Sequence, residues 1–308
     1  MRLSTALPRA LLACALLLLA PAARAQDFRE EHQPLPQFNA PASGPCLGHY
    51  GGSPFNPPQP NDMTFVVDQD YGLDTGCSYR TDGPLNFNIP VTRVVGDVAL
   101  LKANGLISEF ATLRMPAYDV DFDAFVPPYE PERDRVYFNG HLVNEVFLTG
   151  FDSVWKLNTF QVPIEWVNFP SDPGEGGTAT PVNNSVRIEI DTANSELVWC
   201  TSIDWAALTI EVVRPVLMNH GILSSGVVWN DVWLAQLQSL GILYGTPGNH
   251  GNLDSIGNNA GKIGNEVAAA KARFGVDKVV MVGHSKGGLD SRHYVEVNKD
   301  VEQVIQLG

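Results

Sequence analysis

One serine in the C-terminal third of the chain stands in a pattern suited to nucleophilic catalysis. Residues 279–288 read Val-Val-Met-Val-Gly-His-Ser-Lys-Gly-Gly, so Ser285 is the centre of a G-x-S-x-G pattern bounded by Gly283 and Gly287. The pattern alone is weak, but here it follows an apolar strand and opens a helical segment. A tight strand-to-helix turn lifts the hydroxyl above the sheet, near the positive end of the helix. The alternative is a glycine-rich turn with an incidental serine.

A second motif, Asn219-His220-Gly221-Ile222, lies at the end of another apolar segment, with its histidine 65 residues before the serine. A tetrahedral intermediate needs two backbone N–H donors directed at its oxyanion. The residue after the nucleophile, Lys286, would supply one donor, and Ile222 would supply the other. The alternative for His220-Gly221 is an ordinary turn at the end of a strand.

The segments around these motifs alternate between strands and helices. Short apolar runs predict strands over residues 215–219, 241–245, 278–282 and 301–307. From Ile256 to Phe274, apolar residues recur at spacings of 4, 3, 4, 3 and 4, which predicts a helix ending at Gly275. Further helices are expected over residues 231–240 and 286–297. Strands that alternate with helices indicate an α/β fold with a parallel sheet.

Together, Pro215-Val216-Leu217-Met218-Asn219-His220-Gly221-Ile222 and the segment from Val282 to Arg292 resemble the α/β-hydrolase family, and within it the secreted bacterial triacylglycerol lipases and related esterases. The resemblance covers about residues 211–308, a third of the chain. It implies hydrolysis of an ester or lipid substrate through an acyl-enzyme on Ser285, oxyanion donors at Ile222 and Lys286, and no cofactor. Lipases often carry Met or Gln where this chain has Lys286, but the donor is a backbone group.

The general base and its carboxylate partner are harder to place. In this family the chain order is serine, then acid, then histidine. The 23 residues after Ser285 contain His293 and the acids Asp290, Glu296, Asp300 and Glu302. His293 lies two turns down the helix, His284 is on a turn that points elsewhere, and His220 and His250 precede the serine. We therefore expect the acid and histidine of a larger hydrolase to lie beyond Gly308, and the 308-residue chain alone to be nearly inactive.

The first 25 residues have the layout of a secretory signal peptide. Arg2 and Arg9 precede the apolar run 10–20, and Ala23-Arg24-Ala25 offers a cleavage site. Because a membrane helix needs about 20 apolar residues, this run does not predict a membrane span. We expect a secreted, extracellular or periplasmic protein. Cleavage would leave Cys46, Cys77 and Cys200, of which two can form a disulfide whose pairing the sequence does not choose.

The charge divides the rest of the chain in two. Residues 26–215 hold 26 acidic and 10 basic residues, whereas residues 216–308 hold 8 and 7. The net charge of −14 argues against nucleic acid as a partner. We predict a Pro/Gly-rich leader over 26–60, a β-sandwich-like accessory module over 61–214, and the front part of an α/β-hydrolase domain over 215–308.

Residues 61–214 have the pattern of an all-β region. Segments 135–138 and 141–147 flank Asn139-Gly140, a strong hairpin signal because both turn positions favour positive φ. Apolar and polar residues alternate over 185–191 and 206–212, and one helix is expected over 98–110. A β-sandwich is the natural solution. Through Val154-Trp155-Lys156 and Val198-Trp199-Cys200, residues 135–213 resemble galactose-binding-like jelly-roll modules.

Acidic and aromatic residues of this region raise two further hypotheses. The groups Asp68, Asp70, Asp74 and Asp119, Asp121, Asp123 could suggest a cation site, but solvated acidic surface explains both, and we predict no metal. Trp155, Trp166, Trp199 and Trp205 could form a glycan platform, although core packing is the commoner use of tryptophan. The rival function is therefore a non-catalytic secreted protein that binds a glycan or a surface through its β module and carries a degenerate hydrolase segment.

Overall fold

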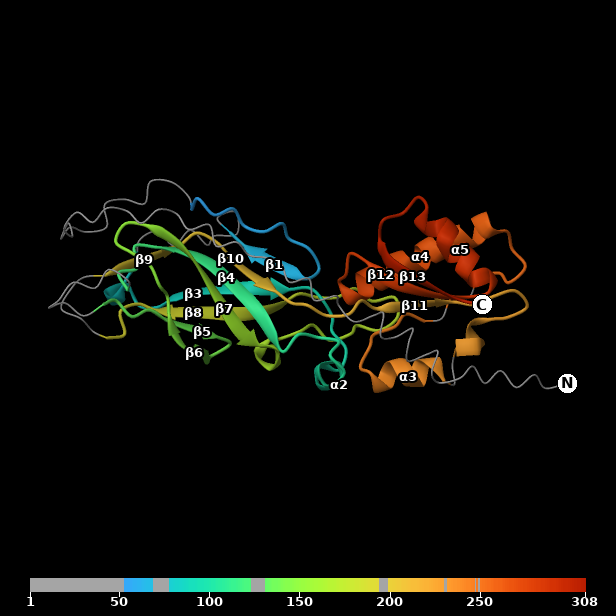
Figure 1. The fold of residues 1–308 in the computed structure, drawn as a ribbon, viewed down its shortest axis with the longest axis horizontal. Coiled ribbons are helices and arrows are strands. Elements are labelled where there is room, and N and C mark those ends of the chain that lie inside the picture. The colour runs from blue at the N-terminus through green and yellow to red at the C-terminus, as the bar shows by residue number, and fades with distance from the viewer. Residues whose placement is uncertain are drawn as a thin grey trace.

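The computed structural model describes residues 53–68, 78–122, 131–193, 199–229, 232–246, 248 and 250–308. The fold is mixed and sheet-rich, with few helices, and most of its strand pairs are antiparallel. The antiparallel sheets lie at one end of the elongated molecule, and a small parallel sheet with its helices lies at the other (Figure 1). The expected signal peptide and most of the expected leader fall outside the described residues.

The larger antiparallel sheet has the order β1-β10-β4-β9-β2, with β7 also paired to β4. Its strands are β1 (Thr64–Val67), β2 (Ser78–Tyr79), β4 (Phe110–Tyr118), β7 (Trp155–Pro163), β9 (Cys200–Ile203) and β10 (Ala206–Thr209). β4 and β7 pair along their whole length, from Phe110 opposite Pro163 to Tyr118 opposite Trp155. Alternate residues of β4 are completely buried, namely Ala111, Leu113, Met115 and Ala117.

The second antiparallel sheet has the order β3-β8-β5-β6, formed by β3 (Leu85–Val91), β8 (Val182–Glu189), β5 (Arg135–Phe138) and β6 (His141–Phe147). The predicted hairpin is confirmed, since Asn139 and Gly140 join β5 to β6 with φ values of 46° and 81°. Ile89, Val136 and Ile188 of this sheet are completely buried in the core that also holds β4. The two antiparallel sheets therefore share one core.

Two local predictions were wrong. The helix expected over residues 98–110 is only α2 (Val98–Ala103), because the chain turns at Gly105 with φ of 66° and Phe110 already begins β4. The strand expected over residues 241–245 is reduced to a single parallel bridge between Val216 and Tyr244. The remaining short elements of the described residues are η2 (Arg80–Asp82), η3 (Ile164–Trp166), η4 (Gly226–Trp229) and α3 (Trp233–Ser239).

The parallel sheet has the order β11-β12-β13, formed by β11 (Val216–Asn219), β12 (Val279–His284) and β13 (Val301–Leu307). Helices α4 (Ile256–Phe274) and α5 (Lys286–Val295) lie on one face of it and α3 lies on the other (Figure 1). Most of the predicted stripe of α4 is buried, namely Ile263, Val267, Ala270 and Phe274, whereas Ile256 at the start of the helix is exposed. Gly275 ends this helix in the left-handed conformation, as the sequence indicates. None of the described helices is long and apolar enough to cross a bilayer.

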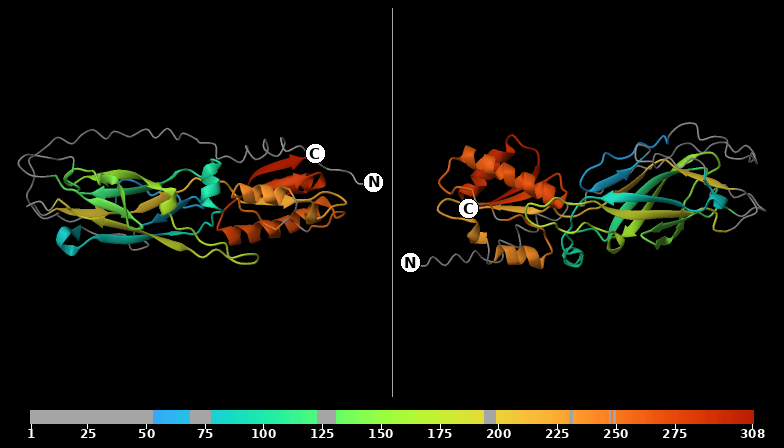
Figure 2. Two further views of the ribbon diagram at one scale, coloured as in Figure 1. Left: turned by 90° about the horizontal axis from the view of Figure 1, so that it is seen from below. Right: turned by 180° about the vertical axis from the view of Figure 1, so that it is seen from behind.

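The two antiparallel sheets form the β region, and the parallel sheet with α3, α4 and α5 forms the parallel-sheet region. The two regions meet end to end (Figure 2) and share buried contacts. Asp62 lies between Arg93, 3.0 Å away, and Arg214, and its backbone N–H donates to Asp277 at 3.0 Å. Burial of Arg93 lowers its pKa to about 10, so the guanidinium stays charged at neutral pH. Asp62, Arg93 and Arg214 therefore belong to an ionic junction where the two regions meet.

Candidate active site

Ser285 occupies the turn between β12 and α5 and has an uncommon backbone conformation. Its φ is 51° and its ψ is −121°, which a non-glycine residue adopts at a cost of roughly 1–3 kcal/mol. The Ser285 N–H donates to the Leu307 carbonyl at 2.8 Å, and the Ser285 carbonyl accepts from the Gly288 N–H at 3.0 Å. Strand β13 and the first turn of α5 therefore hold the serine in this conformation.

The glycines of both motifs are required by close packing around the serine. A methyl group on Gly283 would lie 2.5 Å from the Gly288 Cα, and one on Gly287 would lie 2.5 Å from the His220 carbonyl oxygen. A methyl group on Gly221 would lie 2.9 Å from the Ser285 Cβ. The structure thus places the His220-Gly221 segment directly against the serine, although 65 residues separate the two motifs in sequence.

The two backbone groups expected to act as oxyanion donors flank this contact. Within the described part of the chain, the N–H groups of Ile222 and Lys286 donate to no protein acceptor. The Lys286 side chain turns along α5, where its ammonium lies 2.8 Å from a carboxylate oxygen of the buried Asp290. Asn259 of α4 donates to the same carboxylate at 2.7 Å. The side chain of Lys286 is thus engaged in packing while its N–H stays available.

Two buried histidines lie beside the Gly221 turn. His220 is 2% exposed and His250 is 3% exposed, and their rings stack with centroids 4.3 Å apart and planes inclined by 3°. His250 Nε2 lies 3.2 Å from the His220 carbonyl oxygen, and His220 Nδ1 lies 3.0 Å from the Gly221 carbonyl oxygen. Desolvation lowers the pKa of His250, and the neighbouring His220 lowers it further. The sequence singled out both residues, but not their stacking.

The general base remains unassigned among the described residues, where no histidine hydrogen-bonds to the Ser285 hydroxyl. His293 is 51% exposed and pairs with Glu296 at 3.4 Å, as expected of a residue two turns down α5. His284 adjoins the serine, and its buried Nδ1 has no hydrogen-bond partner in the described part of the chain. Among the described residues, the geometry therefore brings together the predicted nucleophile and the two predicted donors, without a histidine and carboxylate relay.

Exposed apolar side chains gather on the loops around Ser285. The loop after β11 exposes Ile222, which is 53% exposed, together with Leu223, Val227 and Val228. Asn252 donates to the Ser224 carbonyl at 3.1 Å, which joins this loop to the one that exposes Leu253. Leu289, on the first turn of α5, is also exposed. The loop that follows the Gly221 turn and the first turn of α5 therefore both carry exposed apolar side chains.

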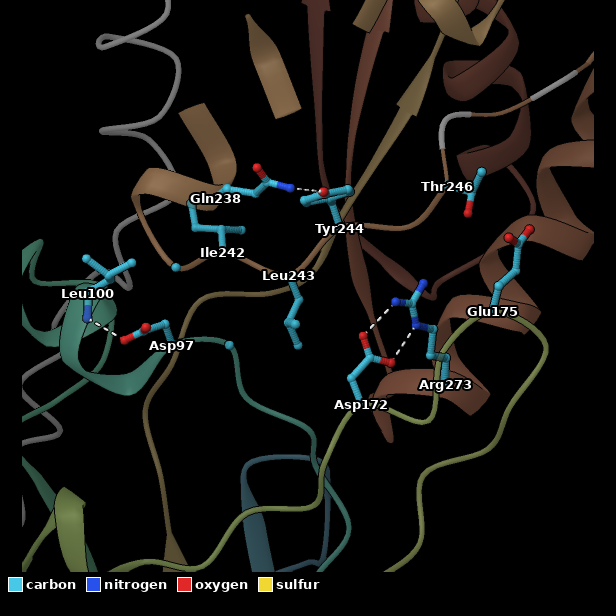
Figure 3. A pocket seen from close by; sticks show the side chains of 12 residues that line it. Asp97, Leu100, Asp172, Glu175, Gln238, Ile242, Leu243, Tyr244, Thr246 and Arg273 are labelled. Carbon is cyan, nitrogen blue, oxygen red and sulfur yellow. Dashed lines mark hydrogen bonds and ion pairs between the residues drawn. The ribbon is translucent and has the colours of Figure 1, made fainter. Parts of the chain in front are cut away.

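A cavity of about 530 Å³ lies away from Ser285, where the two regions meet (Figure 3). Arg273 forms two hydrogen bonds of 2.6 Å to Asp172 there, and Gln238 donates to the Tyr244 hydroxyl at 2.6 Å. The residues of the two sequence motifs do not line it. We assign this cavity to the junction between the regions rather than to the candidate active site.

Carboxylates converge at the far end of the β region. Oxygen atoms of Asp119, Asp121 and Asp152 lie within 4.8 Å of one another, a spacing that could hold a hard cation. Asp70, Asp74 and Asp123, which the sequence also suggested, lie outside the described residues. Asp152 lies on a loop that is distant in sequence, so the spacing of the acidic residues did not predict that it joins this group.

Behind this group, Glu132 and Asp134 are completely buried, and both contact the Thr201 hydroxyl, at 3.0 and 2.5 Å. A hydroxyl has one proton to donate, so the second contact requires a protonated carboxyl group. Burial raises the pKa of Asp134 to about 6, that of Asp119 to about 6 and that of Asp121 to about 7. Desolvation and the nearby Asp134 charge raise the pKa of Glu132 well above its ordinary value. Sequence reasoning missed Glu132 and Asp134.

The tryptophans do not form one platform. Trp205 is buried and donates to the Phe55 carbonyl at 2.6 Å. Trp155 begins β7 and packs on Tyr118, whereas Trp166 follows the other end of β7 and stacks on His141 at 4.6 Å. Trp199 is half-buried. Cys200 is disulfide-bonded, and Cys46 and Cys77 lie outside the described residues.

Comparisons with known proteins give distant neighbours. No family model and no curated protein matches the chain. Among solved structures, a salicylyl-acyltransferase from a tetracycline biosynthetic pathway is 11% identical, with 80% of this chain and 85% of that chain covered and a TM-score of 0.21. An acetyl xylan esterase from the rumen bacterium Butyrivibrio proteoclasticus is 10% identical, with 80% and 90% covered and a TM-score of 0.19. A function for this chain therefore has to be inferred from the geometry around Ser285.

Proposed function

We propose that this chain carries the nucleophile and the oxyanion donors of a secreted serine esterase or acyltransferase of the α/β-hydrolase type. The observation that carries the proposal is the left-handed backbone of Ser285 at a strand-to-helix turn, with Gly221 packed against it. Backbone strain of this kind persists where the surrounding structure enforces it, and it clusters at active sites. An incidental serine in a glycine-rich turn would not account for the abutting Gly221 segment.

The proposed reaction begins with attack of the Ser285 Oγ on the carbonyl carbon of an ester, as a base removes the hydroxyl proton. The carbonyl oxygen becomes an oxyanion that accepts hydrogen bonds from the Ile222 and Lys286 N–H groups. The bond to the alcohol then breaks, and the alcohol leaves with a proton while the acyl group stays on Ser285. Attack by water completes hydrolysis, and attack by a second alcohol completes acyl transfer.

The surroundings of Ser285 favour an ester with an apolar acyl group. Ile222 directly follows the Gly221 that packs against Ser285, and Leu289 lies on the first turn of the helix that follows Ser285; both side chains are exposed, and apolar surface suits an acyl chain better than a charged or sugar group. A lipase-like substrate range is consistent with this arrangement and remains part of the proposal.

The direct test is acylation of the chain by p-nitrophenyl butyrate, followed by intact-mass measurement and peptide mapping. We expect slow addition of one butyryl group on the peptide that contains Ser285, and none in Ser285→Ala. Ser239→Ala is the matched control, because Ser239 is an exposed serine on α3 that bonds within its own helix. Because no histidine of the described residues bonds to the Ser285 hydroxyl, and lack of a triad's base costs on the order of 10⁶ in turnover, we expect less than about one turnover per second. Equal acylation of Ser285→Ala would refute the proposal.

A further inference from the structure

Two successive carbonyl groups of the Gly221 turn accept hydrogen bonds from the stacked histidines. His250 Nε2 meets the His220 carbonyl at 3.2 Å, and His220 Nδ1 meets the Gly221 carbonyl at 3.0 Å. Because a carbonyl oxygen only accepts, both of these ring nitrogens must carry protons. The neutral tautomers are therefore Nε2–H for His250 and Nδ1–H for His220.

These bonds fix the directions of the amide groups on the other side of each peptide plane. In a trans peptide, the carbonyl of one residue and the N–H of the next point in opposite directions. Holding the His220 carbonyl therefore orients the Gly221 N–H, and holding the Gly221 carbonyl orients the Ile222 N–H. The His220 carbonyl is confined on a second side, because a methyl group on Gly287 would lie 2.5 Å from it.

Desolvation lowers the pKa of His250, and the burial of both rings limits the hydrogen bonds that they can form. The other nitrogens, His220 Nε2 and His250 Nδ1, are buried and have no hydrogen-bond partner among the described residues. Protonation of either ring would add a buried N–H without an acceptor, against a parallel ring only 4.3 Å away. The charged groups nearest to His250 are the paired Lys286 and Asp290, together with Glu266, whose carboxylate and the His250 Nδ1 both border Gly248.

We propose that His220 and His250 form a neutral imidazole clamp that holds the Gly221–Ile222 peptide in the orientation needed to bind an oxyanion, with His250 as a positioning residue. The catalytic consequence rests on the function proposed above, whereas the hydrogen bonding within the clamp does not. In this assignment neither histidine is the general base, because the ring nitrogens that keep a lone pair, His220 Nε2 and His250 Nδ1, bond to no group among the described residues, the Ser285 hydroxyl included.

Phenylboronic acid tests the clamp without needing turnover. The Ser285 oxygen adds to boron, the hydroxyl proton leaves to solvent, and the tetrahedral boronate places an oxygen where the oxyanion would lie. The affinity is measured by ¹¹B NMR titration of the full chain, with Ser285→Ala as the blank. Ser285-dependent binding by the wild-type chain is the expected result.

Three variants then separate the hydrogen bond from the packing. His250→Phe keeps a stacked ring but has no donor, and we expect boronate binding at least about 10-fold weaker, since removal of one oxyanion donor costs about 10²–10³-fold in turnover. His250→Gln keeps an amide N–H near the Nε2 position, and we expect binding within about 3-fold of wild type. His293→Phe removes an exposed histidine of α5 and should leave the affinity unchanged.

NMR of the wild-type chain tests the clamp independently of serine chemistry. We expect ¹⁵N imidazole shifts that place the proton on Nε2 of His250 and on Nδ1 of His220, and faster amide exchange of Ile222 in His250→Phe. The opposite tautomers, or boronate binding that His250→Phe leaves unchanged, would overturn the clamp but not the nucleophile. Absence of Ser285-dependent binding, with these tautomers observed, would instead overturn the proposed function and with it the clamp's catalytic role.

Discussion

The two regions of this molecule bury polar groups of different kinds. The β region buries carboxyl groups next to one another, with Glu132 and Asp134 sharing the Thr201 hydroxyl. The parallel-sheet region buries amide and imidazole side chains such as Asn219 and His220, and its buried Asp290 has the Lys286 ammonium beside it. We therefore expect the stability of the β region to depend on bound protons, whereas the proposed clamp uses imidazole N–H groups to hold backbone amides in place.

Asp62 lies at the junction between the two regions, and we expect its replacement to have the largest effect on stability. Arg93 is almost completely buried and pairs with Asp62 at 3.0 Å, while Arg214 reaches the same carboxylate from the junction. Asp62→Ala leaves the Arg93 charge buried without its main partner. We expect the free energy of unfolding to fall by about 3–5 kcal/mol, measured by urea unfolding.

Glu302→Gln is the matched control for the ionic junction. Glu302 pairs with Arg214 at 2.9 Å but is half exposed, so its replacement should cost less than about 1 kcal/mol. Because the two regions share buried contacts, we also expect both to unfold in one transition. Separate transitions in the wild-type chain would show that the regions are independent modules, as the sequence alone suggests.

The buried carboxyl groups predict that stability falls as the pH rises. Burial raises the pKa of Asp119 to about 6 and that of Asp121 to about 7, above their ordinary values near 4. Between about pH 4 and 7 the folded chain therefore binds more protons than the unfolded chain. The stabilisation is complete below about pH 4 and is lost as the pH passes the folded pKa values. Each tenfold difference in proton affinity between the two states is equivalent to about 1.4 kcal/mol of stability. The contribution of Asp121 is smaller, because its side chain is partly exposed and the solvent screens its charge. Thermal unfolding across this range measures the slope.

Glu132→Gln identifies the source of this pH dependence. A glutamine can accept the Asp121 N–H and donate to Thr201, so it mimics the protonated acid. We expect the variant to reduce the loss of stability between pH 4 and 7 by about 1–3 kcal/mol, whereas Glu109→Gln, at an exposed position, should leave it unchanged. A wild-type stability that rises steadily from pH 4 to 7 would contradict the proposed protonation of the cluster.

What the sequence predicted correctly depends on local chain geometry. The Asn139-Gly140 hairpin and the helix from Ile256 to Phe274 follow from positive-φ preferences and from apolar periodicity. The Ser285 turn follows from glycine spacing in the same way. The prediction of a helix over 98–110 was wrong because Phe110, its last residue, belongs to β4 and pairs with Pro163 of β7, a strand distant in sequence.

Features assembled from separate segments had no sequence signal. The carboxyl cluster draws on residues from 119 to 201, and its protonation depends on burial, which no spacing reports. The stacked His220 and His250 are thirty residues apart in sequence. Their alignment depends on how the loop after Gly245 returns past the end of β11, where the Gly248 N–H donates to the Met218 carbonyl at 3.1 Å.

The smallest predicted effect concerns Lys286, whose side chain and backbone have different roles. Lys286→Met removes the ammonium from the buried Asp290, which keeps its hydrogen bond from Asn259. We expect a loss of about 1–2 kcal/mol in the free energy of unfolding. Lys262→Met, at an exposed pair with Asp254, should cost less than about 1 kcal/mol.

Lys286→Met also distinguishes a role of the Lys286 side chain in stability from a role in binding at the candidate site. Since the donor is the Lys286 N–H, Ser285-dependent boronate binding should stay within about 3-fold of wild type although stability falls. Binding that weakens more than about 10-fold at a temperature where the variant is fully folded would mean that the ammonium itself contacts the bound group. Binding in the parallel-sheet region would then depend on a side-chain charge as well as on backbone N–H groups.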